Sequence, residues 1–298
     1  MRVFLTGGTG YVGSAVLEAL VRHGHHVDTL VRNSEDAARV QARGAHPMLG
    51  DLLNPASWRD AAASADGAIH AAVDYSARQR KVDTAAIEVL TALPPRNGRF
   101  LIYTSGIWVL GAAPDPIDET APVNPVELVS WRPAHELRVL ATSAQGVRAV
   151  VVRPGIVYGG CRGIVGDLLQ DAANSLVRVV GGGDNHWPLV YDRDLGELYA
   201  RLVSTPDAAG VYHATDGGAE TVNEIVAALA DHAPTQPSVR HVPLDEARKK
   251  MGPYADALAL DQIVRSPRAR ALGWSPTLHS VAGNAARLFE EWRRGKAA

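Results

Sequence analysis

The chain has 298 residues, and its 30 Lys and Arg against 32 Asp and Glu leave a formal net charge of -2 at pH 7. This balance argues against nucleic acid as the main partner, because no excess positive charge is available to neutralise phosphates. The single cysteine, Cys161, excludes an internal disulfide framework and a cysteine-rich zinc site. No apolar run approaches the ~18–20 residues of a membrane span, and the chain enters a predicted strand at once. We therefore expect a cytoplasmic protein with no signal peptide and no membrane partner.

Short β-rich runs alternate with helical patterns over the first half of the chain, which is typical of a parallel sheet with crossover helices. Pro47 lies in the third run, and because proline cannot donate to a central ladder, we expect that strand at a sheet edge, as in the order 3-2-1-4-5-6. Asn54 and Pro55 predict the N-cap and first residue of a helix. The predicted strands are 3–6, 26–32, 45–50, 68–72, 99–103 and 148–153, with helices from 12, from 34, over 78–93 and over 125–145.

The rhythm becomes irregular after Pro154, where glycine clusters and prolines mark loops. Residues 191–214 predict a helix and a strand that return to the sheet, and Thr221 to Glu224 predicts a capping box. We predict an α/β protein, a Rossmann-type doubly wound parallel sheet with a smaller, mostly helical C-terminal substrate lobe. The dinucleotide-binding domain would comprise residues 1–153 plus about 191–214, and the lobe about 154–190 plus 215–298.

Gly7, Gly10 and Gly13 follow the first strand and open the first helix. Glycines at this spacing allow a tight turn and close approach of the backbone to a pyrophosphate, which then faces the N–H groups and positive dipole end of the helix. Because further βα units follow, the pattern predicts dinucleotide binding over a turn kept only for packing.

The end of the second strand indicates which dinucleotide is bound. NAD sites place an acidic residue there for the ribose 2′-OH, whereas NADP sites place an arginine near the 2′-phosphate. This strand ends at Arg32, and Asp28 lies too early in it to be the acidic partner. Arg32 therefore favours NADP(H) over NAD(H), and Ser34 can add a hydroxyl to the same phosphate. The alternative is a solvated surface arginine.

Several stretches spread over nearly the whole chain match the landmarks of one superfamily: 6–13, 50–52, 70–72, 153–159, 187–194 and 272–276. On these residues the sequence resembles the short-chain dehydrogenases/reductases, in their extended branch of epimerase/dehydratase type. The resemblance implies cofactor contacts from the glycine motif, the strand ends and the loop at the nicotinamide end: Gly7, Thr9, Gly10, Tyr11, Val12, Gly13, Asp51, Leu52, Ala71, Ala72, Tyr103, Thr104, Arg153, Pro154, Gly155 and Ile156.

The catalytic residues that the resemblance calls for are missing. They are a Ser/Thr after the fifth strand and a Tyr-x-x-x-Lys pair on the fifth helix. Alignment places Gly106 at the first position, Trp131 at the tyrosine and His135 at the lysine, and no Tyr-x-x-x-Lys occurs in the chain. The protein therefore resembles an atypical member of the superfamily, with its cofactor half intact and its usual catalytic half absent.

His135, Ser105 and Tyr158 are the candidate catalytic replacements. His135 can do acid–base work near neutral pH or bind the ribose, or it can be hydrogen-bonded within its helix face. Ser105 lies at the C-terminal end of a strand, where it is either a ligand contact or a structural serine. Tyr158 is either the replacement acid or a packed aromatic. Trp131 can stack on a ligand, but an indole N–H cannot exchange a proton in catalysis.

Residues near the strand ends and loops supply the expected substrate contacts. Tyr75 has the alternative of a packed aromatic, and His186 that of a surface or structural histidine. The histidines show no H-x-x-x-H or H-E-x-x-H spacing, so we predict no metal. The expected substrate contacts are Tyr75, Ser105, Gly106, Trp108, Trp131, His186 and Trp187.

We expect an NADP(H)-dependent oxidoreductase that acts on a small organic substrate by reducing a carbonyl, an imine or an activated double bond. Two alternatives stay open: an NADP-binding, non-catalytic sensor or regulator, and an isomerase, dehydratase or cyclase without net redox change. The resemblance also implies that a homodimer can form through the fourth and fifth helices. The identity of the substrate does not follow from the sequence.

Overall fold

The computed structural model describes residues 1–96 and 98–297, which form two compact units. Unit 1 comprises residues 1–105, 131–153 and 195–212, and unit 2 comprises residues 106–130, 154–194 and 213–298. No helix among the described residues combines the length and the apolar character that crossing a bilayer requires.

A seven-stranded sheet has the order β12-β7-β5-β4-β1-β2-β3, and the strands from β7 to β3 run parallel. The order confirms the predicted doubly wound fold and places the Pro47 strand, β3, at an edge, where its missing N–H removes no central ladder bond. The strands are β1 (Arg2–Thr6), β2 (His26–Val31), β3 (His46–Leu49), β4 (Gly67–His70), β5 (Phe100–Thr104), β7 (Arg148–Pro154) and β12 (Gly210–Ala214).

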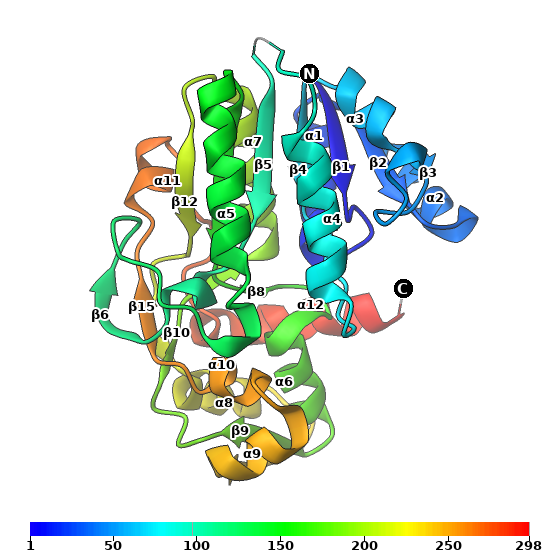
Figure 1. The fold of residues 1–298 in the computed structure, drawn as a ribbon. Helices are drawn as coiled ribbons and strands as arrows, with labels where there is room; N and C mark the ends of the chain where they lie inside the picture. Colours follow the sequence, from blue (N-terminus) through cyan, green and yellow to red (C-terminus); the bar gives the residue numbers. More distant parts are fainter. Residues whose placement is uncertain (97, 298) are drawn as a thin grey trace. The chain divides into compact units, whose positions relative to one another are not determined.

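Helices pack on both faces of the sheet in unit 1. Figure 1 shows α4 and α5 side by side in front of the sheet, with α1 and α7 behind it. On the α3 side, the rings of Phe4 and Trp58 stack with their centroids 5.7 Å apart. The helices are α1 (Tyr11–Arg22), α2 (Ser34–Gln41), α3 (Arg59–Ser64), α4 (Gln79–Thr91), α5 (Arg132–Ala141) and α7 (Asp192–Ser204).

Two predicted helices differ from the structure. Asn54 and Pro55 do stand at the N-cap and the first position of a helix, but this helix is a single 3₁₀ turn. Asn54 makes no side-chain cap; its carbonyl accepts from the Ser57 N–H and hydroxyl, which closes a 3₁₀ turn over Pro55–Ser57 before α3 begins at Arg59. The helix predicted over 125–145 divides into a 3₁₀ turn at Glu127–Val129, α5, and a 3₁₀ turn at Thr142–Gln145. Pro133, which has no N–H to donate to a preceding turn, lies in the first turn of α5 and fixes its start.

Unit 2 consists of paired short strands and helices around its own apolar core. The predicted capping box is confirmed, because Thr221 accepts from the Glu224 N–H and the Glu224 carboxylate accepts from the Thr221 N–H. The strand pairs are β8 (Ile156–Tyr158) with β11 (Leu189–Tyr191), β9 (Leu176–Val180) with β14 (Ser238–Val242), β10 (His186–Trp187) with β13 (Glu220–Thr221), and β6 (Ala113–Ile117) with β15 (Gln262–Val264).

The other elements of unit 2 are mainly helical. They are a 3₁₀ turn (Ile107–Leu110), α6 (Gly163–Ala173), α8 (Val222–Asp231), α9 (Leu244–Met251), α10 (Tyr254–Leu258), α11 (Pro267–Ala271), a 3₁₀ turn (Ala282–Asn284) and α12 (Ala285–Ala297).

A buried tyrosine–carboxyl pair lies in unit 2. The Tyr158 hydroxyl, on a fully buried side chain, donates to Asp216 Oδ2 over 3.3 Å, and the Gly218 N–H donates to Asp216 Oδ1 over 2.8 Å. Burial, reinforced by the negative charge of Glu220, raises the pKa of Asp216 to about 6. Burial and the neighbouring Asp216 charge also raise the pKa of Tyr158 well above its usual value. Tyr158 is thus a packed tyrosine and a very weak acid.

Close packing of α7 on α1 predicts that position 196 tolerates no branched side chain. A Cβ at Gly196 would lie 2.5 Å from the carbonyl oxygen of Ala15. Gly196→Val should lower the free energy of unfolding by about 1–3 kcal/mol, since overlap with backbone outweighs the roughly 0.5 kcal/mol that valine gains over glycine in a helix. Urea unfolding measures the effect. The control is Gly182→Val, where a Cβ meets its nearest atom at 3.4 Å; equal stability of the two variants would contradict the packing argument.

The raised pKa of Asp216 predicts a pH dependence of stability. Because the folded-state value of about 6 exceeds the unfolded value near 3.8, the carboxyl group stabilises the fold below about pH 4, and this contribution is lost as the pH rises to about 6. Between pH 4 and 6 the wild type should lose about 1–3 kcal/mol of unfolding free energy relative to Asp216→Asn. Urea titrations of both proteins across this range measure the difference, and parallel pH profiles would rule the mechanism out.

Candidate functional site at the carboxyl ends of the strands in unit 1

The turn between β1 and α1 fits a dinucleotide phosphate group. Gly7 has φ +81°, and a Cβ there would lie 2.6 Å from the backbone N and Cα of Ala72. A Cβ at Gly13 would overlap the carbonyl oxygen of Gly7. Helix α1 begins after Gly10, no side chain caps it, and no acidic residue lies in its first turn. The turn therefore brings bare backbone and a positive helix end together, as a phosphate requires.

Arg32 and Ser34 follow β2 and are both exposed, as is Asp51, which follows β3. Asn33 between the first two caps α2 by accepting from the Asp36 N–H over 2.8 Å. Asp51 Oδ1 accepts from the Leu53 N–H over 2.8 Å, so its turn is fixed from within. The backbone of Ala71 and Ala72 lies against Gly7. These predicted cofactor contacts thus lie on or beside the carboxyl ends of β1, β2, β3 and β4.

Two helices place charged side chains on their buried faces here. Asp83 lies on the buried stripe of α4 with Ala86, Ile87 and Leu90. In α5 the buried residues are Arg132, His135, Glu136 and Val139, at the i, i+3, i+4, i+7 spacing of a core-facing stripe. The first turns of both stripes are therefore polar, where an ordinary core helix would be apolar.

The Asp83 carboxylate is the centre of a buried hydrogen-bond network. Oδ2 accepts from His135 Nδ1 over 2.6 Å and from the Tyr103 hydroxyl over 3.0 Å, and Oδ1 accepts from His70 Nε2 over 3.2 Å. The far nitrogens of the two rings meet hydroxyls: Thr6 Oγ1 lies 2.7 Å from His70 Nδ1, and Thr84 Oγ1 lies 3.1 Å from His135 Nε2. We call Thr6, His70, Asp83, Thr84, Tyr103, Arg132 and His135 the Asp83 network.

The network is satisfied when each imidazole carries its proton on the nitrogen that faces Asp83, because the threonine hydroxyls then donate to the other nitrogens. Arg132 Nη1 donates to the Tyr103 hydroxyl over 3.1 Å and to the Thr104 carbonyl over 3.0 Å. Burial alone would raise the pKa of Asp83, but hydrogen bonds from His135 and His70, with the charge of Arg132, hold it well below its usual range. Asp83 is therefore a fixed negative charge that orients His135.

Ser105 belongs to a second buried cluster. Its hydroxyl donates to Glu136 Oε1 over 2.5 Å, and Arg153 binds both oxygens of the same carboxylate, through Nε at 3.1 Å and Nη2 at 2.5 Å. All three side chains are buried. Because the Ser105 proton is committed to Glu136, the serine oxygen is held in one orientation. Arg153, predicted as a cofactor contact, is the counter-ion of Glu136.

Other predicted residues of unit 1 have different surroundings. The Thr104 hydroxyl contacts the Tyr199 hydroxyl over 2.7 Å. Trp131 is half-buried, with the Arg132 guanidinium 4.6 Å from its ring centroid. The Trp131 and His135 rings meet edge to face with their centroids 5.1 Å apart. Tyr75 is 89% exposed, so it is not a packed aromatic.

The remaining predicted residues lie in unit 2. The Ile156 N–H donates to the Pro188 carbonyl. A Cβ at Gly155 would lie 2.5 Å from the same carbonyl oxygen, so the backbone at Gly155 packs closely against Pro188. His186 Nδ1 lies 2.8 Å from Asp261 Oδ1, and Trp187 donates to the Leu258 carbonyl over 3.0 Å. The other two predicted contacts are Trp108, whose ring meets the edge of Tyr254, and Gly106, where a Cβ would meet nothing within 4 Å.

Sequence reasoning missed Asp83, Arg132 and Glu136. The available signal was their position, because each is a charged residue at an apolar position of an otherwise amphipathic helical stripe. Buried charges of this kind are rare unless they are paired.

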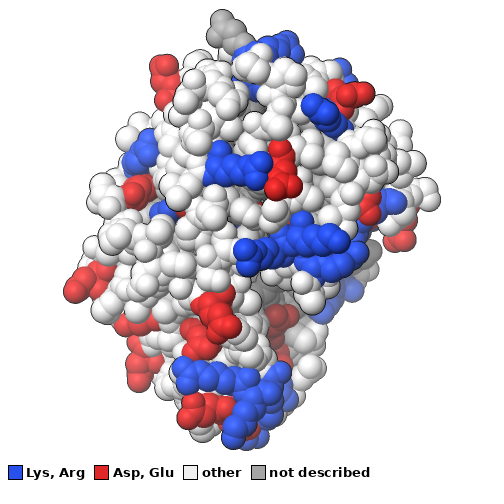
Figure 2. All heavy atoms as spheres, in the orientation of Figure 1, with Lys and Arg blue, Asp and Glu red and all other residues white. Residues whose placement is uncertain are grey.

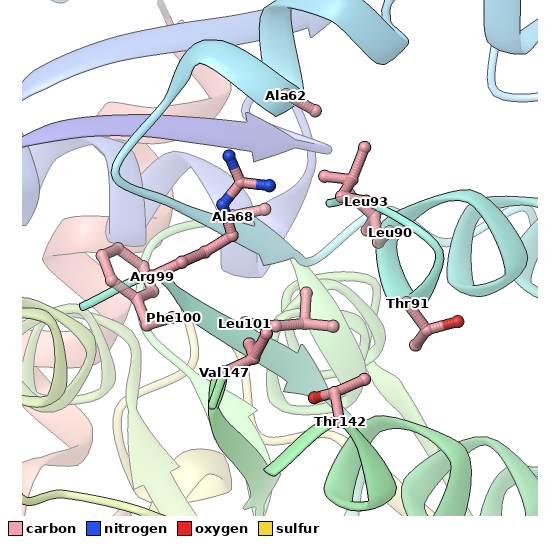
Figure 3. Close-up of a pocket in the computed structure, with 10 residues that line it drawn as sticks. All are labelled: Ala62, Ala68, Leu90, Thr91, Leu93, Arg99, Phe100, Leu101, Thr142 and Val147. Atoms are coloured by element: carbon pink, nitrogen blue, oxygen red, sulfur yellow. The ribbon is translucent and has the colours of Figure 1, made fainter. Parts of the chain in front are cut away.

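A small cavity opens at the opposite, amino ends of the central strands (Figure 3). The Arg99 guanidinium beside it donates to the carbonyls of Pro94 and Ala63, and the space suffices for about one water molecule. Ligands of open α/β sheets bind at the carboxyl ends, so this cavity is a packing gap. Within residues 1–96 and 98–297, no group of three or more His, Cys, Asp or Glu side chains is arranged to hold a metal ion.

Two relatives are similar to this chain over most of its length. An uncharacterized protein of Schizosaccharomyces pombe is 32% identical over 94% of this chain and 96% of its own length. The 4-hydroxy-2-methyl-3-oxo-4-farnesyl-3,4-dihydroquinoline-1-oxide ketoreductase of Stigmatella aurantiaca is 29% identical over 83% of this chain and 78% of its own.

Solved structures share the fold at low sequence identity. The human epimerase family protein SDR39U1 with NADPH has a TM-score of 0.74 at 19% identity, covering 97% of this chain and 99% of its own. The Streptomyces venezuelae dTDP-glucose 4,6-dehydratase DesIV with NAD has a TM-score of 0.83 at 20% identity, covering 100% and 98%.

The family model of the NAD dependent epimerase/dehydratase family matches residues 3–215. This match spans every strand of the seven-stranded sheet and the glycine turn. The chain belongs to the NAD-dependent epimerase/dehydratase family.

Proposed function

We propose that this protein is an NADP(H)-dependent oxidoreductase that reduces the ketone of a small organic substrate. The observation that carries the proposal is the pairing of a phosphate-accepting glycine turn with Arg32, an exposed cation at the end of β2 where an NAD site would place an acid.

The cofactor assignment rests on charge. In this region the 2′-phosphate of NADP would meet Arg32 and the Ser34 hydroxyl, and the pyrophosphate would meet the N-terminus of α1. Arg32 makes no ion pair within 4 Å among the described residues, so its guanidinium can accept a phosphate. One structural neighbour carries NADPH and another NAD, so the fold alone permits either cofactor.

The reaction class rests on the relative named as a ketoreductase. Bound NADPH would supply the hydride. The protein must then supply a proton to the developing alkoxide, and the usual tyrosine for this task is replaced by Trp131.

His135 is the proton source that the geometry favours. Asp83 fixes the Nδ1–H of its ring, while Nε2 faces the Thr84 hydroxyl on a half-buried side chain. To act as the acid, the ring would have to carry a second proton on Nε2. It would give that proton to the Thr84 hydroxyl, which passes its own proton to the alkoxide, while Nδ1–H stays on Asp83 and water later restores the Nε2 proton. Ser105, held by Glu136, acts as a fixed polar contact at the end of β5. The predicted homodimer stays a prediction; Leu137 on α5 is 69% exposed.

The cofactor proposal predicts a measurable preference. Calorimetric titration should give an affinity for NADPH about tenfold or more above that for NADH, because a charge-assisted phosphate contact contributes roughly 1.5–3 kcal/mol. Arg32→Met should remove most of the difference, while Arg39→Met on the neighbouring helix should preserve it. A panel of ketones with NADPH absorbance as readout tests the reaction. Tight NADPH binding with no ketone reduced would reject the proposed reaction and favour a regulatory protein.

The proton proposal predicts a specific loss of turnover. His135→Gln should lower kcat for ketone reduction about 100-fold or more, as expected for loss of a general acid, with the NADPH affinity of the wild type. Asp83→Asn should lower kcat as well, because it removes the charge that orients the ring. The surface change His23→Gln is the control, and thermal unfolding checks that each variant is folded. Wild-type kcat in folded His135→Gln would show that the proton comes from elsewhere.

A further inference from the structure

The start of α4 carries an unusual charge distribution for a helix. Arg78 precedes the helix, Arg80 and Lys81 lie in its first turn, and no acidic residue or side-chain cap is present there. Cations at a helix N-terminus oppose the macrodipole and are unfavourable unless an anion lies near them. In Figure 2, Lys and Arg side chains gather on this face over the region where Figure 1 shows the start of α4.

The loop before α4 is built to hold Arg78 in place. Asp74 Oδ1 accepts from the Ser76 N–H over 2.8 Å, the Ser76 hydroxyl accepts from the Arg78 N–H over 3.2 Å, and Arg78 Nη2 lies 3.3 Å from Asp74 Oδ2. The same loop begins at Ala71 and Ala72, whose backbone lies against Gly7. A short hydrogen-bonded turn thus connects Arg78 to Ala71 and Ala72, the residues that lie against the glycine turn.

Asp74 lies within the electrostatic reach of two arginines. Hydrogen bonds from Ser76, followed by the charges of Arg78 and then Arg32, lower the pKa of Asp74. Arg32 follows β2 and Arg78 lies in the loop after β4. Both strands pair in parallel with β1, so the two segments leave the same edge of the sheet on either side of the glycine turn. The two arginines and one carboxylate carry a net charge of about +1, which leaves attraction for a phosphate monoester carrying about -1.5 to -2 at pH 7.

We propose that Arg78 is a second specificity-determining residue for the 2′-phosphate of the cofactor, acting with Arg32, and that Asp74 holds Arg78 in place until the phosphate replaces it. The inference rests on the proposed NADP(H) dependence. An exposed Arg–Asp pair contributes little stability, because solvent and salt screen it. A phosphate offers the guanidinium a bidentate, doubly charged partner and therefore displaces the carboxylate.

The experiment measures dissociation constants by calorimetry for adenosine 2′,5′-bisphosphate, AMP, NADPH and NADH on the full chain. Arg78→Met should weaken binding of adenosine 2′,5′-bisphosphate and NADPH about tenfold and leave AMP and NADH unchanged. Asp74→Asn should tighten the two 2′-phosphorylated ligands about two- to fivefold, the effect expected on removing an exposed competing carboxylate. Its amide oxygen still accepts from the Ser76 N–H, so the turn is preserved.

Arg80→Met is the matched control for a general loss of positive charge, and it should leave all four ligands at wild-type affinity. Equal weakening of NADPH and NADH in Arg78→Met, no weakening of either, or the same loss in Arg80→Met would overturn the assignment of Arg78. Failure of the underlying proposal looks different. In that case the wild type itself would bind NADPH and NADH equally, and Arg32→Met would change neither affinity.

Discussion

The polar end of unit 1 depends on one buried negative charge, the carboxylate of Asp83. An isolated charge in the interior would cost several kcal/mol, and here three hydrogen-bond donors and the nearby Arg132 offset that cost. The donors come from β4, β5 and α5, so one carboxylate on α4 fixes three other elements. The His135 ring cannot turn away without leaving the charge short of a partner, which is why its orientation is determined.

In the neighbouring cluster of Ser105, Glu136 and Arg153, hydrogen bonds and an arginine again offset the cost of a buried carboxylate. Helix α5 supplies the arginine of the Asp83 network, whereas it supplies the carboxylate of this cluster. The partner of Glu136 in this ion pair is Arg153, which lies near the end of β7. Asp83 and Glu136 are matched by Arg132 and Arg153, so the buried end of the sheet carries balanced charge. In this family member, a closed ionic arrangement occupies the helix on which the superfamily resemblance places a tyrosine and a lysine.

Features that depend on a few consecutive residues were predictable from the sequence. The glycine turn, the edge position of the Pro47 strand and the capping box at Thr221 each follow from backbone restrictions or adjacent side chains. Helix boundaries were less so. Asn54 has the chemistry of a cap, but its side chain caps nothing, and the helix that follows it is a single 3₁₀ turn that closes on Ser57.

The sequence by itself determined the glycine turn after β1, because this turn and the following helix N-terminus are formed from contiguous residues and together fit a phosphate. Only the tertiary structure decided the surroundings of His135 and Ser105, the residues that we propose in place of the usual catalytic pair. His135 meets a carboxylate 52 positions away, and Ser105 meets one 31 positions away. Such partners are brought together by the strand order and by the helix faces that pack on the sheet. Residue spacing within one helix or strand therefore cannot predict them.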